Sequence, residues 1–234
     1  MLKPLRILAK TVLFFALLGL AYFLTDLATW GFTIARLRTS LPLGPSDGVD
    51  PYLYLEQKFY LKAQGGQSYV FVSSDGKTIL KFFKDMPRPW IPFANYQTKK
   101  LSKLKRTLTG YQLAFERLRK ESGLLYLHLR PTSTFLPAIL IDRLNIEHSI
   151  DLSSTYFILQ KRAAPLADLS ADTLSQISNL LQKRASQHIS DHDPRLQSNL
   201  GWCDGQLVFI DPGRFVEDTH ASAELPLKFV ERLP

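Results

Sequence analysis

The sequence predicts an α+β domain preceded by one transmembrane helix, and three observations support this prediction. Residues Ile7–Leu24 are strongly apolar and contain a single charge. Between Phe59 and Phe83, three short runs of strand-forming residues are separated by turn signals. Residues Ser170–Gln187 place leucine and isoleucine at helical spacing. Strand patterns and helix patterns in separate stretches of one chain are typical of an α+β fold.

The apolar stretch Ile7–Leu24 is interpreted as a membrane anchor. Its eighteen residues would span about 27 Å as a helix, which is near the lower limit for a bilayer core. Lys10 is its only charge and lies near one end, where a lysine can reach the interface. A cleaved signal peptide is the second interpretation, although no clear cleavage site follows. A buried core helix is the third, although the stretch is apolar on every side.

The sequence leaves open on which side of the membrane the domain lies. Basic residues usually stay on the cytoplasmic side of a single helix. The bias is small here and mildly favours a domain outside the cytoplasm, because charges occur at both ends of the helix. These charges are Lys3, Arg6 and Lys10 at the start, and Asp26, Arg36 and Arg38 after it.

The chain is basic, with a formal net charge of +8, and its composition of 45% apolar and 21% charged residues is that of a globular domain. Part of the positive charge is concentrated at residues 99–106. This stretch is interpreted as a solvated helix face beside the membrane, and contact with anionic lipid is the alternative. No zinc motif or RNA-binding signature is present, so no nucleic-acid partner is expected. The single cysteine, Cys203, cannot form an internal disulfide. The local basic residues are Lys99, Lys100, Lys103, Lys105 and Arg106.

The chain is predicted to contain three segments: a membrane segment and its flank at 1–38, a linker rich in Pro, Gly and Ser at 39–56, and a folded domain at 57–234. The folded domain opens with an antiparallel meander of three strands, in which Asp75-Gly76 is a strong hairpin signal. These strands are predicted at Phe59–Lys62, Tyr69–Val72 and Thr78–Phe83.

Two features of this meander suggest a phosphate site. Its first turn contains Gly65 and Gly66, and glycine lets backbone N–H groups approach phosphate oxygens closely. Lys81 lies within a strand among bulky apolar residues, where a charge is costly unless it is paired or faces a cleft. Hairpin geometry and a solvent-facing lysine explain the same residues without a ligand.

The remaining elements are predicted from apolar patterns and helix breakers. Residues 85–98 contain three prolines and are predicted as a loop. A helix is expected at Gly110–Ser122, and its Glu116 is the candidate partner of Lys81. Further strands are predicted at Leu124–Leu129, Ala138–Asp142 and Thr155–Gln160, and a further helix at Ser170–Gln187.

The strongest functional signal lies near the C-terminus. An acidic loop contains Asp193, with Asp191 as a rival for the same role, and ends in Asn199. The apolar strand Leu207–Ile210 then leads into Asp211 of an Asp-x-Gly motif. Hard oxygen ligands of this kind bind Mg²⁺, and a carboxylate near an acceptor hydroxyl serves phosphoryl transfer. The pattern predicts a Mg-nucleotide site; a β-hairpin with polar turns is the alternative.

The order of these elements resembles the protein-kinase-like superfamily over roughly residues 57–216. The resemblance implies a two-lobed fold with an antiparallel N-lobe sheet, and ATP and Mg as cofactors. It implies that Lys81 binds the nucleotide phosphates and pairs with Glu116, while Asp193 orients the acceptor hydroxyl. It also implies that Asn199 and Asp211 bind Mg²⁺.

The C-terminal part departs from the family pattern. The family places a histidine two residues before the loop aspartate and an asparagine five residues after it. Here His192 directly precedes Asp193, and Asn199 follows six residues later. Pro212 replaces the usual phenylalanine, and only 21 residues follow Gly213, which predicts a truncated C-lobe.

Three functions are compatible with these features. The first is a membrane-anchored, ATP–Mg-dependent phosphotransferase that acts on a small molecule, lipid or envelope glycan. In such a phosphotransferase, the resemblance implies that Gln160–Ala163 would form a hinge, with backbone groups that bind an edge of the adenine ring. The second is a catalytically inactive kinase-like interaction module at a membrane, as in a pseudokinase. The third is a membrane-anchored protein outside the kinase group.

Overall fold

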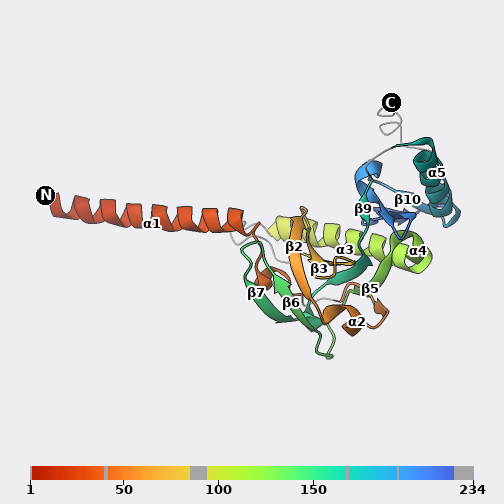
Figure 1. Ribbon diagram of the computed structural model, residues 1–234. Coiled ribbons are helices and arrows are strands. Elements are labelled where there is room, and N and C mark those ends of the chain that lie inside the picture. The colour runs from red at the N-terminus through yellow and green to blue at the C-terminus, as the bar shows by residue number, and fades with distance from the viewer. Residues whose placement is uncertain (1, 40–41, 85–93, 167–168, 194, 224–234) are drawn as a thin grey trace.

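The molecule consists of a long N-terminal helix, a curled sheet with a helix along it, and a smaller group of strands with a helix at the far end (Figure 1). The predicted α+β fold is confirmed. This computed structural model describes residues 2–39, 42–84, 94–166, 169–193 and 195–223.

The described part of the chain contains five α-helices and thirteen strands, with short 3-10 segments between them. The helices are α1 (Leu2–Ala28), α2 (Tyr52–Leu55), α3 (Ala94–Arg117), α4 (Arg119–Ser122) and α5 (Ala171–Ser186). The first eight strands are β1 (Ser46–Gly48), β2 (Lys58–Gln64), β3 (Ser68–Ser73), β4 (Thr78–Phe83), β5 (Leu124–His128), β6 (Pro137–Ile141), β7 (Glu147–Asp151) and β8 (Phe157–Lys161). The others are β9 (Ala164–Pro165), β10 (Ile189–Asp191), β11 (Leu200–Cys203), β12 (Gln206–Phe209) and β13 (Phe215–Glu217).

The first eight strands form one sheet in the order β1-β5-β8-β4-β3-β2-β6-β7. The predicted antiparallel meander is confirmed as β2, β3 and β4. The prediction of an antiparallel sheet is wrong at one junction, because β6 runs parallel to β2. Parallel neighbours need a long connection, and here the chain passes through β3, β4, α3, α4 and β5 between them.

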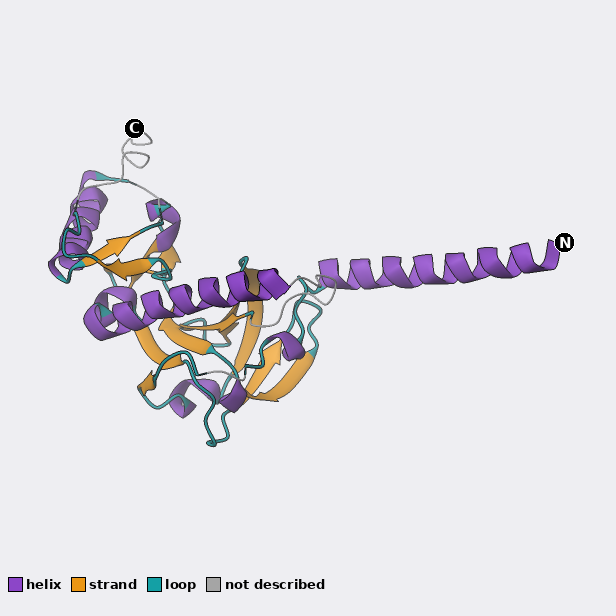
Figure 2. Cartoon of the chain, turned by 180° about the vertical axis from the view of Figure 1, so that it is seen from behind, coloured by secondary structure: helices purple, strands orange, loops and turns teal. Residues whose placement is uncertain are grey.

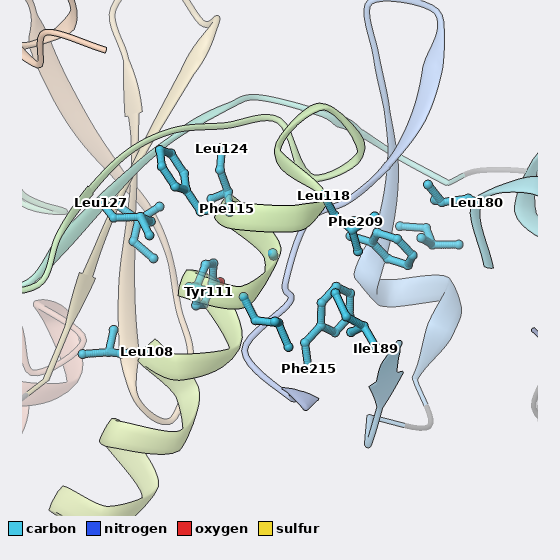
Figure 3. Close-up of a cluster of buried hydrophobic side chains, with 14 of the residues drawn as sticks. Leu108, Tyr111, Phe115, Leu118, Leu124, Leu127, Leu180, Ile189, Phe209 and Phe215 are labelled. Carbon is cyan, nitrogen blue, oxygen red and sulfur yellow. The ribbon is translucent and has the colours of Figure 1, made fainter. Parts of the chain in front are cut away.

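The sheet separates two apolar cores, because successive side chains of a strand point to opposite faces. Leu80 and Phe82 of β4 belong to one core, whereas Phe83 belongs to the other. In the second core, α3 places Tyr111 and Phe115 between the sheet and the C-terminal strands (Figure 3). Each fully buried side chain of this size stabilises the fold by about 1.5–3 kcal/mol.

Helix α3 is longer than predicted. Residues 85–93 of the predicted loop lie outside the described residues, but residues 94–98 are already helical. The predicted helix Gly110–Ser122 therefore covers only the end of α3, together with α4. Leu104, Leu108 and Tyr111 give the earlier part of α3 an apolar face, which its many lysines conceal in the sequence.

Residues 42–56 of the segment predicted as a linker are folded onto the sheet, whereas residues 40–41 lie outside the described residues. This segment contains β1, which pairs with β5, and α2, whose Leu55 is buried. The residues before it are also packed, because Phe32 and Leu37 belong to the same core as Leu80. Gly48 ends β1 and Pro51 is the N-cap of α2, so these two residues lie at the ends of elements.

Helix α1 projects from the domain, as both views show (Figures 1 and 2). Its stretch Arg6–Ala28 is long and apolar enough to cross a membrane, and none of it is buried against the domain. The end of the helix is held by aromatic contacts. The Phe32 ring lies 5.3 Å from that of Tyr69 on β3, and the Arg143 guanidinium lies 4.4 Å from the Trp30 ring.

Candidate functional site

A cleft of about 450 Å³ lies between the sheet, α3 and the C-terminal strands. It combines three of the features that the sequence predicts, namely the glycine turn, Lys81 and the two aspartates of the C-terminal motifs. It also contains basic residues that sequence reasoning did not assign to a site. The polar, charged and glycine residues that line it are Gly65, Gly66, Gln67, Ser68, Lys81, Lys103, Arg106, Thr107, His192, Asp193, Arg195, Asp211, Gly213 and Arg214.

Lys81 and Asp211 form an ion pair at the centre of the cleft. The Lys81 Nζ atom lies 3.0 Å from Asp211 Oδ1, and its side chain is only 10% exposed. The pair is possible because successive side chains of β4 point to opposite faces of the sheet, so that Lys81 points away from the core of Leu80 and toward α3. Asp211 follows β12 directly, so two strands distant in sequence deliver the two charges.

Tyr111 of α3 completes this pair and was not predicted as a site residue. Its hydroxyl donates to Asp211 Oδ1 at 2.7 Å and accepts a hydrogen bond from the Lys81 ammonium. The Lys81 Nζ atom also lies 5.0 Å from the centre of the Tyr111 ring. The signal in the sequence was a hydroxyl on the otherwise apolar face of α3.

The expected pair between Lys81 and Glu116 is not formed, and this prediction is corrected by the structure. Glu116 is exposed on α3 and accepts a hydrogen bond from Gln112 Nε2 at 2.9 Å. Five residues along a helix correspond to a rotation of about 140° beyond one full turn. The face of α3 that carries Tyr111 toward Lys81 therefore turns Glu116 away from the cleft.

The charges of this centre are fixed by their neighbours. Burial raises the pKa of Asp211, but the Lys81 charge and the Tyr111 hydrogen bond outweigh it and leave that pKa below its usual value. Burial raises the pKa of Tyr111 well above its usual value, and the Asp211 carboxylate adds to this effect. At neutral pH, Asp211 is ionised and Tyr111 keeps its proton.

Asp193 lines the cleft opposite this centre and is bound by Arg195. The Arg195 guanidinium donates from Nε to Oδ1 at 3.0 Å and from the terminal nitrogen to Oδ2 at 2.8 Å. These bonds are the main cause of a pKa for Asp193 far below its usual value of 3.8. The side chain of Arg195 is 69% exposed and lines the cleft.

Asp191, the rival for the same role, has a different position. Its Oδ1 atom accepts the backbone N–H of Asp193 at 2.8 Å, and it is not among the residues that line the cleft. Burial raises the pKa of Asp191 above its usual value. Asp191 therefore supports the loop that presents Asp193.

The Asp193–Arg195 pair predicts a pH-dependent stability. A carboxyl group whose folded pKa is depressed adds stability above its unfolded pKa, and this contribution is lost as the pH falls through the folded pKa. Wild-type protein should therefore be more stable than Arg195→Gln at pH 7, and the difference should shrink as the pH falls below about 3.8. Urea unfolding between pH 7 and pH 2 measures this difference. Arg214→Gln serves as a control, and a difference that stays constant with pH for Arg195→Gln would contradict the prediction.

Asn199 lies beside Asp211 through the pairing of β11 and β12. Leu200 is opposite Phe209, and the Asn199 carbonyl accepts the N–H of Ile210 at 2.8 Å. The side chain of Asn199 is buried, and its Nδ2 atom makes no hydrogen bond to a described residue. It is still near enough to Asp193 to help lower the pKa of that carboxyl.

These residues fit a magnesium ion held together with a nucleotide. Asp211 Oδ1 accepts hydrogen bonds from Lys81 and Tyr111, whereas Oδ2 accepts none from a described residue. Mg²⁺ in nucleotide sites typically uses one or two protein oxygens plus phosphates and waters. Asp211 Oδ2 can supply one of those contacts, and Asn199, which is buried and is not among the residues that line the cleft, is the candidate for a second. Among described residues, no group of three His, Cys, Asp or Glu forms a metal site by itself.

The glycine turn is open toward the cleft. The Gly65 N–H donates to the Ser68 carbonyl at 2.9 Å, and the Gly65 carbonyl accepts from Lys84 Nζ at 2.8 Å. A side chain at Gly66 would meet nothing within 4 Å. The turn thus offers backbone that a ligand can approach closely.

Two further glycines bring α3 and the Asp-x-Gly segment together. A Cβ atom at Gly110 would lie 2.6 Å from the Pro212 carbonyl oxygen, and one at Gly213 would lie 2.9 Å from Thr107 Cγ2. The close approach lets the Tyr111 hydroxyl reach Asp211 at 2.7 Å. Gly110 is therefore part of the support of the cleft, although it does not line it.

The predicted hinge, Gln160–Ala163, is already engaged by the protein. The N–H groups of Lys161 and Arg162 donate to the carbonyls of Gly123 and Lys77, each at 2.8 Å. The Gln160 side chain donates to the Ser122 carbonyl at 2.7 Å. The backbone N–H groups of Lys161 and Arg162 are therefore not free to bind an adenine edge.

No protein-family model and no curated relative matches the sequence. The solved structures to which the chain is similar include WbdD in complex with the kinase inhibitor LY294002, at 14% identity and a TM-score of 0.40, covering 73% of this chain and 35% of that chain. They also include the ROP18 kinase domain in complex with AMP-PNP and sucrose, at 16% identity and a TM-score of 0.38, covering 66% and 50%. A third is the Legionella pneumophila Lpg2603 kinase bound to IP6, at 14% identity and a TM-score of 0.34, covering 71% and 52%.

The chain spans between about a third and about half of the length of these structures. ROP18 and Lpg2603 are kinases, and the WbdD structure contains a kinase inhibitor. At these identities and TM-scores, the case for a kinase-like site depends on the geometry of the cleft itself.

Proposed function

We propose that this protein is a membrane-anchored, ATP–Mg-dependent phosphotransferase of the protein-kinase-like class. One observation carries the proposal. Lys81, Asp193 and Asp211 come from three separate segments of the chain and line one cleft together with the glycine turn. Phosphoryl transfer needs positioning and charge neutralisation more than covalent chemistry, and these residue types supply both.

Each residue has a distinct role in the proposed reaction. Lys81 binds the nucleotide phosphates, because its ammonium group can turn away from Asp211 and toward them. Asp193, ionised because of Arg195, accepts a hydrogen bond from the acceptor hydroxyl and aligns it. Arg195 places positive charge beside the transferred group. Bound Mg²⁺, held by Asp211 and Asn199, would neutralise the phosphate oxygens.

The membrane anchor is part of the proposal. Helix α1 contains the one stretch among the described residues that is long and apolar enough to span a bilayer. The acceptor would then be a small molecule, lipid or glycan met at the membrane. ATP would require the domain to lie in the cytoplasm, against the mild bias of the flanking charges.

A second candidate, a nucleotide-binding module without transfer, is favoured by one contact. Asp211 is the carboxylate partner of Lys81, and the same carboxylate is needed for Mg²⁺. The α3 residue that faces Lys81 is a tyrosine and carries no charge to replace Asp211. Nucleotide binding that does not depend on Mg²⁺ would support this candidate.

Thermal unfolding of the full chain in neutral detergent, with ATP and with or without Mg²⁺, tests the proposal. Mass action predicts a rise of about 5 °C or more at ligand concentrations a hundredfold above Kd. The shift should require Mg²⁺ and disappear in Lys81→Ala. Lys77→Ala, which removes an exposed lysine of the same lobe, should keep it. Equal shifts in wild type and Lys81→Ala would refute the nucleotide site.

A further inference from the structure

The cleft holds more positive charge than its two carboxylates can neutralise. Lys81 is paired with Asp211, and Arg195 with Asp193. Lys103, Arg106 and Arg214 also line the cleft, and their side chains form no ion pair or hydrogen bond with the residues that the structure describes. Uncompensated cations that converge on one cavity are a binding site for an anion.

Two of the unpaired cations, Lys103 and Arg106, lie on α3 before Tyr111, the residue that contacts the Lys81–Asp211 centre. Along α3, Tyr111 contacts that centre, and Thr107 Oγ1 donates to Gln67 of the glycine turn at 3.2 Å. Lys103 lies eight residues before Tyr111, which corresponds to about 12 Å along the helix axis. A nucleotide whose terminal phosphate meets Lys81 and Asp211 would thus leave Lys103 and Arg106 for a second group.

The glycine turn of the cleft is connected to the exit of α1 through a short series of contacts. The Tyr69 hydroxyl donates to the Gly31 carbonyl at 2.5 Å, and Lys84 Nζ lies 4.2 Å from the centre of the Tyr69 ring. The same Lys84 Nζ donates to the Gly65 carbonyl in the glycine turn. Figure 2 shows the N-terminal end of α3 directed toward the end of α1. A ligand in the interface of the anchoring membrane would approach the cleft from this end.

We infer that Lys103, Arg106 and Arg214 form an acceptor subsite that binds a phosphomonoester, so that the acceptor carries a phosphate as well as the hydroxyl. Arginine and lysine bind such a dianion by charge-assisted hydrogen bonds. The phosphate can belong to a lipid headgroup or to a soluble metabolite, because the recognised chemistry is the same. This inference builds on the proposed phosphotransferase.

The test measures binding of two probes to the full chain in neutral detergent, with the nucleotide site first saturated by Mg-AMP-PNP. Dioctanoyl phosphatidic acid and glycerol 3-phosphate share a phosphomonoester and differ in their acyl chains. Each is titrated by thermal unfolding. Lys103→Ala/Arg106→Ala removes two of the cations, and Lys62→Ala/Lys77→Ala removes two exposed charges outside the cleft.

We expect a stabilising shift on top of that of the nucleotide, weakened about tenfold or more in apparent affinity in Lys103→Ala/Arg106→Ala and unchanged in the control. A shift with both probes shows that the phosphate group alone is recognised, whether a lipid or a soluble molecule carries it. A shift with phosphatidic acid alone shows that the acyl chains are also needed and identifies a lipid. Absence of a shift, competition with AMP-PNP, or equal binding by the cleft variant would overturn the subsite. Absence of the Mg-AMP-PNP shift itself would refute the proposed function separately.

Discussion

Replacing Asp211 with asparagine is expected to lower phosphate release from ATP by about a thousandfold or more. Asparagine keeps the size of the side chain but removes the charge that pairs with Lys81 at 3.0 Å and that would hold Mg²⁺. Losing one preorganised charge at a reacting centre costs about 10²–10³ in rate, and weakened metal binding adds to this loss. Phosphate release by the full chain in nanodiscs, at saturating Mg-ATP, measures the effect.

The stability of Asp211→Asn should change much less than its activity. The Asp211 side chain is 47% exposed and partly screened by water, but Lys81 is only 10% exposed and loses its charged partner, so the expected loss is about 1–3 kcal/mol. Asp204→Asn is the matched control, because Asp204 is an exposed aspartate that pairs with Lys161 at 2.7 Å outside the cleft. Wild-type phosphate release by Asp211→Asn, in a preparation without other ATPases, would show that Asp211 takes no part in transfer.

Gly110→Ala is expected to inactivate the protein without touching the cleft. The new Cβ would lie 2.6 Å from the Pro212 carbonyl oxygen and 3.0 Å from the Gly213 carbonyl carbon. Because these are backbone atoms, the Asp-x-Gly segment has to move away from α3. A displacement of about 1 Å at a reacting group can lower the rate by about a hundredfold.

The effect of Gly110→Ala on stability combines two opposing terms. Alanine favours a helix over glycine by about 1 kcal/mol, whereas overpacking costs about 1–3 kcal/mol. We therefore expect a small net destabilisation in urea unfolding, together with a large loss of phosphate release. Thr109→Ala, at an exposed position of the same helix, should keep full activity. Wild-type activity in Gly110→Ala would show that the close packing of α3 does not position Asp211.

Local patterns predicted the parts of the fold that depend on neighbouring residues. The β2–β3–β4 meander follows from strand alternation and the Asp75-Gly76 turn. The helix predicted at Ser170–Gln187 is α5, and Ser170 caps it by accepting the Thr173 N–H. The parallel pairing of β2 with β6 could not be predicted in this way, because it joins segments about 80 residues apart.

The candidate site was predictable where a residue type is unusual in its setting. A lysine within an apolar strand and an aspartate at the end of another were both recognisable, and the structure brings Lys81 and Asp211 together. The choice between Glu116 and Tyr111 was not recognisable, because it depends on how α3 is rotated against the sheet. Sequence charge favoured the glutamate, whereas the packing of α3 turns the tyrosine inward.

The contacts at the end of α1 have a consequence for how often the cleft meets an acceptor. A domain on a flexible tether sweeps a volume whose radius grows with the square root of the tether length. With Phe32 and Leu37 buried in the domain core, this radius becomes small, and the proposed membrane anchor would hold the cleft at one height above a bilayer. Encounters with a membrane-borne acceptor then occur by lateral diffusion in two dimensions, so turnover should follow the number of acceptor molecules per membrane area.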